Sequence, residues 1–420
     1  MPYFISGVTA DHQNLIARTP AQFKSMNDID VKTRHRVMAI DPAGHTVTVR
    51  DLQTGHEYLE GYTRLLISTG AEAFVPPIEG TELEGVFTLR RLTDSLRIKR
   101  YLADARPRRA VIVGAGPIGM EMCESFATLG LEVTVMDLAG QVMPYMSPDM
   151  AERVQARIEK EGVICLLEQS VTAIAGDGGA VRGVVTSNGE IKADLVLLAI
   201  GVRPVSGIAA DAGLELGARG AIRVDEQMRT TGEDIFAAGD CATTTHTITG
   251  RQVWLPLGST SRKQGRACAD NMFGGETRFA GVQGTSVVKC FDLTVGRTGL
   301  GEAEATEAGF SPAVISIEAE SLHQYYPGRG TMNLKLIADG GSGRLLGAEV
   351  VGQMSSVADK RLDVLAVAID AGMTADHLQY LDLAYAPPYS TSVDIPVIAG
   401  NIMTGKIRGM ECGCGPHGLD

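Results

Sequence analysis

The chain has 420 residues, 44% of them hydrophobic and 21% charged, which is typical of a globular protein with two or three domains. Its net charge is −12 and its basic residues are scattered, so a nucleic-acid partner is not expected. No apolar run is long enough to span a bilayer, and residues 1–13 lack the pattern of a signal peptide. We therefore expect a cytoplasmic protein without membrane contact.

Strands and one helix are predicted before residue 106. Apolar and β-branched runs predict strands at 31–40, 45–51 and 62–69. Residues 92–105 have helical spacing, and Pro107 marks residues 106–109 as a linker. From residue 110 onward strands and helices alternate, which indicates βαβ units and a parallel sheet. Strands are expected at 110–114, 131–137 and 193–201, and helices at 117–129 and 149–161.

The remainder of the chain has a different character. A strand is predicted at 234–240 and a helix at 261–273. Further on, residues 332–352 predict a hairpin around a glycine-rich turn, and residues 357–371 predict an apolar helix. The last twenty or so residues are expected to be irregular.

The segment from residue 111 to Asp137 contains a glycine-rich loop between a strand and a helix. Gly114, Gly116 and Gly119 form the pattern G-x-G-x-x-G. The first glycine permits a tight turn, the second lets the backbone approach a pyrophosphate, and the third lets the helix pack closely on the strand. The helix N-terminus offers free N–H groups to phosphates. This combination predicts a dinucleotide site.

Asp137 ends the second strand of this unit, where an acid accepts hydrogen bonds from the adenosine ribose. Because a 2′-phosphate would meet a like charge there, NAD(H) is favoured over NADP(H). A purely structural acid is the alternative interpretation.

Two further segments, Leu65–Gly80 and Thr230–Ala242, each place a glycine turn after a strand. Asp240 ends the second of these strands, where a carboxylate accepts from ligand hydroxyls. Taken alone, either segment is also compatible with an ordinary strand–loop junction. In this order around the Gly114 loop, they resemble the pyridine nucleotide-disulfide oxidoreductases, flavoproteins with two dinucleotide folds. The resemblance covers essentially the whole chain.

The resemblance is greatest to the single-cysteine branch of that family, which contains coenzyme A-disulfide reductases, coenzyme A persulfide reductases and NADH oxidases. The segments that mark this branch are RTPAQFK at 18–24, LPLGSTSRKQGRACADN at 255–271, HQYYPG at 323–328 and LAYAPPYS at 383–390. It implies an α/β fold with two Rossmann-like domains, the first incomplete, and a C-terminal α+β dimerisation domain. The expected ranges are 1–105 with 226–290 for FAD, 106–225 for NAD(P), and 291–420 for dimerisation.

The resemblance implies FAD and NAD(P)H as cofactors, with NADH favoured, and a homodimer. It places the following residues at the FAD adenine, ribityl–phosphate part and flavin ring: Val37, Thr69, Gly70, Gly239, Asp240, Gly258, Ser259 and Thr260. The dinucleotide loop would be completed by Pro117 and Ile118, and the nicotinamide would be bordered by Glu121 and Gly201.

Four tyrosines near the C-terminus are also implied by the resemblance. Tyr325, Tyr326 and Tyr385 would support catalysis in the partner subunit, and Tyr389 would contact the cofactor there. Aromatic residues beside proline usually serve packing, and that alternative stays open.

The chain departs from the family pattern at its start. The family's redox cysteine lies just before a Gly-Leu/Met-Pro-Tyr segment, and Met1-Pro2-Tyr3 aligns inside that segment. A βαβ unit needs roughly 30 residues, so the FAD-binding unit with its glycine loop and the nucleophilic cysteine are expected upstream of Met1. Either the chain is read from an internal Met of a longer protein, which the intact motifs favour, or it is a natural remnant. We expect weak or no FAD binding and poor stability.

Seven cysteines are spaced irregularly, without a C-x-x-C dithiol, which fits a reducing compartment. Cys123 and Cys165 are expected in the core, and Cys241 either near FAD or in packing; Cys268 and Cys290 stand in no redox motif. The tail residues Cys412, Cys414 and His417 are candidates for a soft metal, a mobile redox relay, or an incidental frayed end. A closed zinc site needs four ligands, so no metal is predicted.

The activity implied is hydride transfer from NAD(P)H through FAD to a coenzyme A disulfide, a persulfide or a related disulfide. Oxygen is the alternative acceptor, and a truncated, non-catalytic NAD-binding protein is the alternative class. Arg262 and Lys263 either help to hold a phosphate-rich substrate or lie on a solvated surface. Coding sequence upstream of Met1 with a strand, a glycine loop and Cys-Gly would decide for the enzyme.

Overall fold

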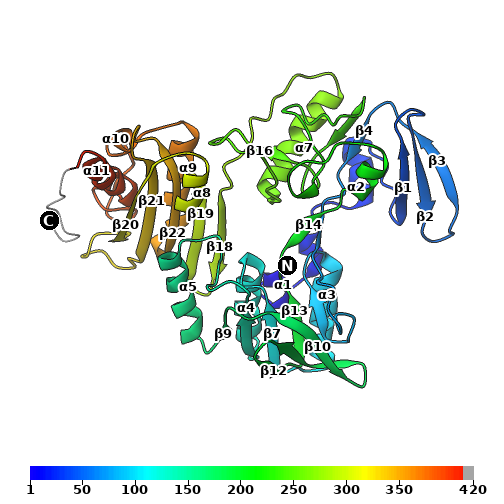
Figure 1. Cartoon of the computed structure of the whole chain (residues 1–420), viewed down its shortest axis with the longest axis horizontal. Helices are drawn as coiled ribbons and strands as arrows, with labels where there is room; N and C mark the ends of the chain where they lie inside the picture. The colour runs from blue at the N-terminus through cyan, green and yellow to red at the C-terminus, as the bar shows by residue number, and fades with distance from the viewer. Residues whose placement is uncertain (410–420) are drawn as a thin grey trace.

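The computed structural model describes residues 1–409 and divides them into three lobes (Figure 1). The lower lobe of Figure 1 contains a five-stranded parallel sheet in the order β6-β13-β7-β8-β9. Its strands are β6 (Val86–Thr88), β13 (Leu195–Leu198), β7 (Arg109–Val113), β8 (Glu132–Met136) and β9 (Ile164–Leu166). The predicted parallel sheet is thereby confirmed.

Three helices and a small antiparallel sheet accompany these strands. The helices are α3 (Leu92–Asp104), α4 (Pro117–Thr128) and α5 (Pro148–Lys160), and the small sheet contains β10 (Val171–Asp177), β11 (Ala180–Thr186) and β12 (Gly189–Lys192). All three helices were predicted within one residue at each end. The division proposed from the sequence falls at residue 105, after β6 and α3, although β6 hydrogen-bonds to β13 of this sheet.

The upper lobe is built around a short parallel pair, in which β4 (Leu65–Ile67) lies beside β15 (Ile235–Ala237). Two antiparallel pairs join β5 (Ala71–Ala73) to β14 (Val202–Pro204), and β16 (Thr244–Thr245) to β17 (Gln252–Val253). Its helices are α6 (Gly207–Asp211), η2 (Ala218–Gly220) and the long α7 (Gly258–Met272). The predicted helix at 261–273 is therefore confirmed and begins three residues earlier.

The N-terminal region lies across two lobes. A three-stranded antiparallel sheet contains β1 (His35–Asp41), β2 (Thr46–Asp51) and β3 (Glu57–Gly61), at the right of Figure 1. It is preceded by α1 (Pro2–Ile5), η1 (His12–Leu15) and α2 (Pro20–Asn27). Helix α1 packs on α3 and α4, and Ile5 is buried in the hydrophobic core of the lower lobe.

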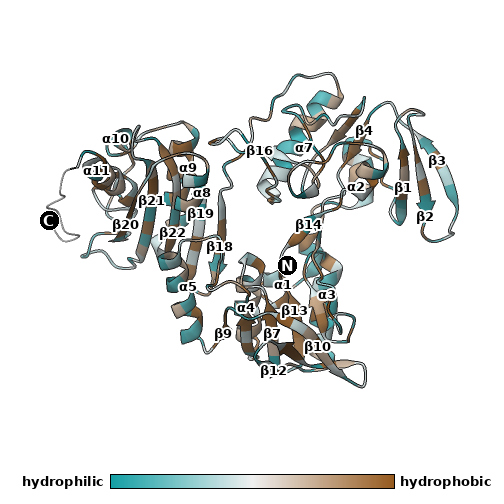
Figure 2. Ribbon diagram, in the orientation of Figure 1, coloured by the Kyte–Doolittle hydropathy of each residue, from teal (hydrophilic) through white to brown (hydrophobic). Residues whose placement is uncertain are grey.

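The C-terminal lobe is a five-stranded antiparallel sheet in the order β18-β19-β22-β21-β20. Its strands are β18 (Ser286–Cys290), β19 (Leu293–Gly299), β22 (Leu345–Gln353), β21 (Thr331–Asp339) and β20 (Pro312–Glu320). Its helices are α8 (Glu302–Glu307), η3 (Met354–Ser356), α9 (Ala358–Asp370), α10 (Ala375–Leu378) and α11 (Ile395–Ile407). The hairpin at 332–352 and the helix at 357–371 are confirmed, and Figure 2 shows the strands of both five-stranded sheets as largely hydrophobic.

The expectation of an irregular end is wrong up to Ile407. Helix α11 forms because the Asp394 side chain caps its first turn and Pro396 occupies an early helical position. Ile395, Ala399 and Met403 recur every four residues and are buried. No helix within residues 1–409 is long and apolar enough to cross a bilayer.

Candidate functional site

The three glycines of the loop between β7 and α4 have three different surroundings. Gly114 has a φ of +109°, and a Cβ there would lie 2.4 Å from the carbonyl oxygen of Ala199. A Cβ on Gly119 would lie 2.0 Å from the carbonyl oxygen of Gly114. A Cβ on Gly116, by contrast, would meet no atom within 4 Å. The first and third glycines thus permit close backbone packing, and the second leaves open space where a pyrophosphate can approach.

The N-terminus of α4 faces this open space. Gly116 is its N-cap, no side chain caps the first turn, and Pro117 occupies the first helical position. The side chain of Ile118 is 39% exposed, so the end of the helix is accessible. Free N–H groups and the positive end of the helix dipole are therefore available to phosphates.

The backbone of Ala115, in the middle of the loop, is held by two hydrogen bonds. Its N–H donates to Oδ2 of Asp137 at 2.7 Å, and its carbonyl accepts from the N–H of Met143 at 2.8 Å. The other oxygen of Asp137 accepts from the N–H of Ala139 at 2.9 Å. Asp137 therefore holds the loop through these two hydrogen bonds, and its remaining lone pairs stay available to ligand hydroxyls.

Glu121 lies on α4, one turn beyond the loop. It accepts a hydrogen bond of 3.0 Å from the hydroxyl of Tyr3. Burial raises the pKa of Glu121, and burial beside Glu121 raises the pKa of Tyr3. Sequence reasoning did not find Tyr3 as a site residue, because the contact joins positions 118 residues apart. Gly201, expected at the same place, has a φ of +105° and nothing close to a Cβ.

A second group of expected residues meets at the carboxyl ends of β4 and β15. The Ser68 hydroxyl donates to the Ala238 carbonyl at 3.1 Å, which places Thr69 and Gly70 beside Gly239. Both glycines have positive φ, +72° and +88°. Two loops thus turn sharply at one edge of the upper lobe.

Asp240 is paired within this edge. It forms an ion pair with Arg90 and accepts from the Ser261 hydroxyl at 2.6 Å. Arg90 was not found from the sequence, because it lies 150 residues away from Asp240. The pairing holds Asp240 at the beginning of α7.

The N-terminus of α7 completes the edge. Its first three residues, Gly258, Ser259 and Thr260, follow an N-cap that makes no side-chain hydrogen bond. A Cβ on Gly258 would meet no atom within 4 Å, so the helix end is open. These donors fit the flavin end of FAD, which gains negative charge on reduction. For the adenosine half, residues 1–409 contain no second G-x-G-x-x-G pattern, and Val37 lies on β1 in the separate antiparallel sheet.

The four tyrosines all lie in the C-terminal lobe, and the rings of Tyr325 and Tyr385 contact His323. Its ring stacks on Tyr325 with centroids 5.3 Å apart and meets Tyr385 edge-on at 5.9 Å. Its Nε2 atom accepts from the N–H of Ser392 at 3.2 Å. Tyr325 and Tyr389 are 68% and 76% exposed, whereas Tyr326 is only partly exposed. The exposed rings are therefore available to a second surface.

None of the five cysteines within residues 1–409 has the surroundings of a nucleophile. Four are buried and Cys165 is partly buried. Burial raises the pKa of Cys123, raises those of Cys165 and Cys268 to about 11, and raises that of Cys290 to about 12. Cys241 is buried and its Sγ lies 3.5 Å from the carbonyl oxygens of Ile67 and Ala238, as the packing interpretation predicts. Such thiols are inert at neutral pH.

The predicted metal candidates in the tail, Cys412, Cys414 and His417, lie outside the described residues. Within residues 1–409, no group of three metal-ligating side chains comes together. Arg262 and Lys263 lie on the first turn and a half of α7, and both are exposed.

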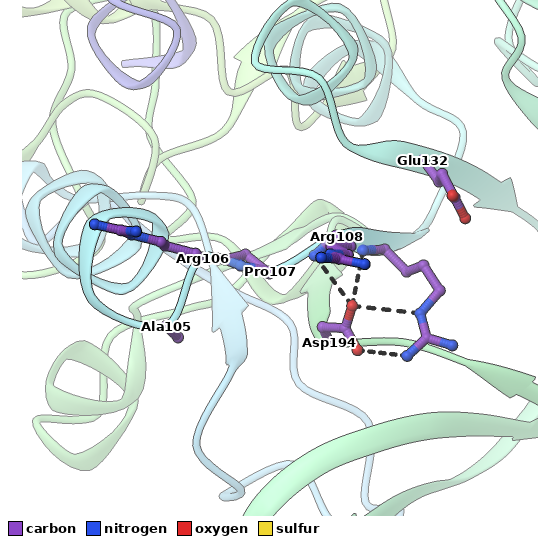
Figure 3. A pocket seen from close by; sticks show the side chains of 7 residues that line it. Ala105, Arg106, Pro107, Arg108, Glu132 and Asp194 are labelled. Carbon is purple, nitrogen blue, oxygen red and sulfur yellow. Dashed lines mark hydrogen bonds and ion pairs between the residues drawn. The ribbon is translucent and has the colours of Figure 1, made fainter.

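One open pocket of about 580 Å³ lies at the opposite end of β7 from the glycine loop. Arg106, Arg108 and Arg109 line it together with Asp194 and Glu132, as Figure 3 shows. Asp194 accepts from the guanidinium of Arg109 and from two backbone N–H groups, which lowers its pKa. Asp194 therefore holds the start of β7 in place, and the pocket contains none of the predicted cofactor residues.

Comparison with known proteins agrees with this arrangement. The pattern of the pyridine nucleotide-disulphide oxidoreductases matches residues 4–265, and the pattern of their dimerisation domain matches residues 285–395. The NAD(P)H coenzyme A polysulfide/persulfide reductase of Pyrococcus horikoshii is 35% identical over 404 residues, which cover 96% of this chain and 88% of the relative.

Two solved structures show the likeness in three dimensions. The NAD-dependent persulfide reductase of A. fulgidus is 39% identical with a TM-score of 0.93, covering 97% of this chain and 76% of that chain. The water-forming NADH oxidase of Lactobacillus brevis bound to NADH is 26% identical with a TM-score of 0.91, covering 97% and 89%. The chain therefore belongs to the pyridine nucleotide-disulphide oxidoreductases and is an FAD- and NAD(P)H-dependent oxidoreductase.

Proposed function

We propose that this chain takes hydride from NADH and passes electrons to a coenzyme A disulfide or persulfide. The observation that carries the proposal is the glycine loop, with open space at Gly116 and with Asp137 bonded to Ala115. The relatives from P. horikoshii and A. fulgidus are named for coenzyme A persulfide and for persulfide reduction, which supports the acceptor class.

The choice of NADH rests on the carboxylate of Asp137. In an NADPH-bound engineered variant of the L. brevis oxidase, an aspartate 18 positions after a substituted glycine is replaced by alanine, and the next residue by arginine. Gly119 and Asp137 have the same separation here, and Leu138 follows. A carboxylate at this place repels a 2′-phosphate and accepts from ribose hydroxyls. We therefore expect NADH to bind more tightly than NADPH.

The flavin end of FAD would be held by Gly239, Asp240 and the first turn of α7, with Thr69 and Gly70 beside them. When bound, FAD supplies the two-electron acceptor for the hydride. The open N–H groups of Gly258, Ser259 and Thr260 favour negative charge at the ring. The expectation of weak FAD binding stays a prediction. It rests on the adenosine half of FAD, for which residues 1–409 offer fewer binding partners than for the flavin end.

Glu121 and Gly201 would border the nicotinamide. Because Glu121 accepts a hydrogen bond of 3.0 Å from the hydroxyl of Tyr3, the two side chains hold each other at a fixed position. We propose that the pair orients the nicotinamide and excludes water from its edge.

A homodimer is the proposed assembly, in which Tyr325, Tyr326, Tyr385 and Tyr389 of one protomer reach the active site of its partner. The match to a dimerisation domain and the exposure of Tyr325 and Tyr389 support it. The proposed location is the cytoplasm, since the five described cysteines are unpaired thiols. The proposed domain ranges are those given from the sequence, with two boundaries moved: β6 and α3 go with the parallel sheet, and β18 goes with the C-terminal sheet.

Oxygen is the second candidate acceptor, and one observation favours it. Reduction of a disulfide or persulfide proceeds by thiolate attack on sulfur. The five cysteines of residues 1–409 are buried or partly buried, and burial raises the pKa of four of them. Oxygen, in contrast, needs no thiolate.

The acceptor is tested by NADH oxidation with added FAD, measured with coenzyme A disulfide, with coenzyme A persulfide, and with oxygen. Faster anaerobic NADH oxidation with either sulfur substrate than without it supports the main proposal. Turnover only with oxygen supports the oxidase. NADH binding without turnover on any acceptor contradicts both and identifies a non-catalytic NAD-binding protein.

A further inference from the structure

The C-terminal sheet carries a row of three charged side chains across adjacent strands. Glu349 on β22 lies opposite Arg297 on β19 and opposite Lys335 on β21 in the strand register. Glu349 and Lys335 are buried. Opposite charges directly across strands attract each other, but buried charges need further partners.

Those further partners come from the segment Met143–Asp149, which precedes and begins α5. Both carboxylate oxygens of Glu349 accept from the N–H of Ser147, at 2.9 and 3.2 Å, and one accepts from its hydroxyl at 3.1 Å. The guanidinium of Arg297 donates to the carbonyl of Tyr145. Lys335 forms an ion pair with Asp149. One lobe thus fixes the backbone of a segment that belongs to another lobe.

The same segment holds the nucleotide loop at its other end. The N–H of Met143 donates to the carbonyl of Ala115, between Gly114 and Gly116. Met143 is fully buried and has a φ of +48°, a left-handed conformation that a side chain other than glycine rarely adopts. Such a conformation persists only where the surroundings fix it. The anchors at Tyr145 and Ser147, two and four residues away, supply that constraint.

We propose that Glu349 is a positioning residue for the NADH site, acting through the segment Met143–Asp149. Its carboxylate holds Ser147, the segment then holds Met143 in its left-handed conformation, and Met143 holds the peptide of Ala115 in the loop. The lobe that matches a dimerisation domain thereby sets the geometry of the nucleotide loop. This inference rests on the proposed binding of NADH at that loop.

The test measures NADH affinity by fluorescence titration of the full chain, together with thermal stability. Glu349→Ala removes all acceptors for Ser147 and should weaken NADH binding roughly three- to thirtyfold. Glu349→Gln keeps one carbonyl acceptor and should bind NADH within about twofold of the wild type. In the loaded enzyme, Glu349→Ala should raise KM for NADH and leave kcat nearly unchanged.

Arg157→Gln is the matched control. Arg157 lies further along α5 and pairs with Asp292 of the C-terminal lobe, so it joins the same lobes without touching the segment. It should lower stability but leave NADH affinity within about twofold. Glu349→Ala alters a buried site, so a second variant at a more exposed position is included. Asp149→Asn changes the half-exposed partner of Lys335 and should bind NADH about two- to threefold more weakly than the wild type.

Equal loss of NADH affinity in Glu349→Ala and Arg157→Gln would overturn the inference, because general loosening of the lobes would explain it. Unchanged affinity in both Glu349→Ala and Asp149→Asn would overturn it as well. A wild-type chain that fails to bind NADH contradicts the proposed function instead, and the inference fails with it.

Discussion

Replacing Gly116 by alanine separates ligand binding from folding at the nucleotide loop. The backbone of Gly116 has φ −79° and ψ −170°, which any residue adopts, and a Cβ would meet no atom within 4 Å. The free energy of unfolding should therefore change by less than about 0.5 kcal/mol. The added methyl group would instead occupy the space in which the pyrophosphate approaches the backbone.

The loss of NADH affinity follows from the hydrogen bonds at stake. A hydrogen bond from a backbone N–H to a charged phosphate contributes about 1.5–3 kcal/mol. Loss of one such bond at the α4 N-terminus weakens binding roughly ten- to hundredfold. Gly119→Ala should differ, because its Cβ would lie 2.0 Å from the Gly114 carbonyl oxygen. That clash should destabilise the fold by roughly 1–3 kcal/mol or more.

The assay combines NADH fluorescence titration with urea denaturation on the same preparations. Gly207→Ala is the matched control, because a Cβ there also meets nothing within 4 Å but Gly207 lies on α6, away from the loop. It should leave both quantities unchanged. Wild-type NADH affinity in Gly116→Ala would refute the assigned role of the loop, and so would a loss of affinity that is accompanied by several kcal/mol of destabilisation.

Three further predictions concern stability and reactivity. Arg361→Met should cost about 3–5 kcal/mol of unfolding free energy in denaturant titration, because it removes a buried guanidinium that pairs with the partly buried Asp394 and donates to the carbonyls of Ser356 and Tyr389; a cost below about 1 kcal/mol would contradict this. The hydrogen bond from Arg109 lowers the pKa of Asp194 in the folded chain. The ionised carboxylate therefore stabilises the fold at pH values above the ordinary carboxyl pKa, and this stabilisation is lost as the pH falls below that value. Wild-type stability should therefore fall faster than that of Asp194→Asn between about pH 5 and pH 3 in thermal denaturation, and parallel curves would contradict this. Because burial raises the pKa of Cys123, thiol labelling mapped by mass spectrometry should modify it at pH 8 only after unfolding, and rapid labelling of the folded chain would contradict this.

Local signals in the sequence predict the elements around the nucleotide loop closely. Pro117 at the first turn of α4 and the apolar run of β7 are read directly from neighbouring residues. The three glycine roles also follow from spacing alone, and the structure gives each glycine matching surroundings. Strand β3 was missed because four of its five residues, Glu57–Gly61, are exposed and two of them are glutamates, without apolar–polar alternation.

Contacts between distant positions could not be predicted in the same way. The pairing of Arg90 with Asp240 joins residues that are 150 positions apart, and no motif around either residue indicates the other as its partner. Likewise, β6 joins the parallel sheet through hydrogen bonds to β13, more than a hundred residues later. The charged row around Glu349 depends on the pairing register of β19, β22 and β21. A single sequence specifies such a register only through the pattern that shows which face of each strand is buried.

The central claim is that NADH, held at the Gly114 loop, reduces FAD in this chain. Anaerobic titration of the FAD-saturated protein with NADH, followed by flavin absorbance, tests it most directly. We predict that about one equivalent of NADH bleaches the flavin, and that NADPH does so only at much higher concentration because of Asp137. A bound flavin that NADH leaves oxidised, or one that both nucleotides reduce equally well, would contradict the account.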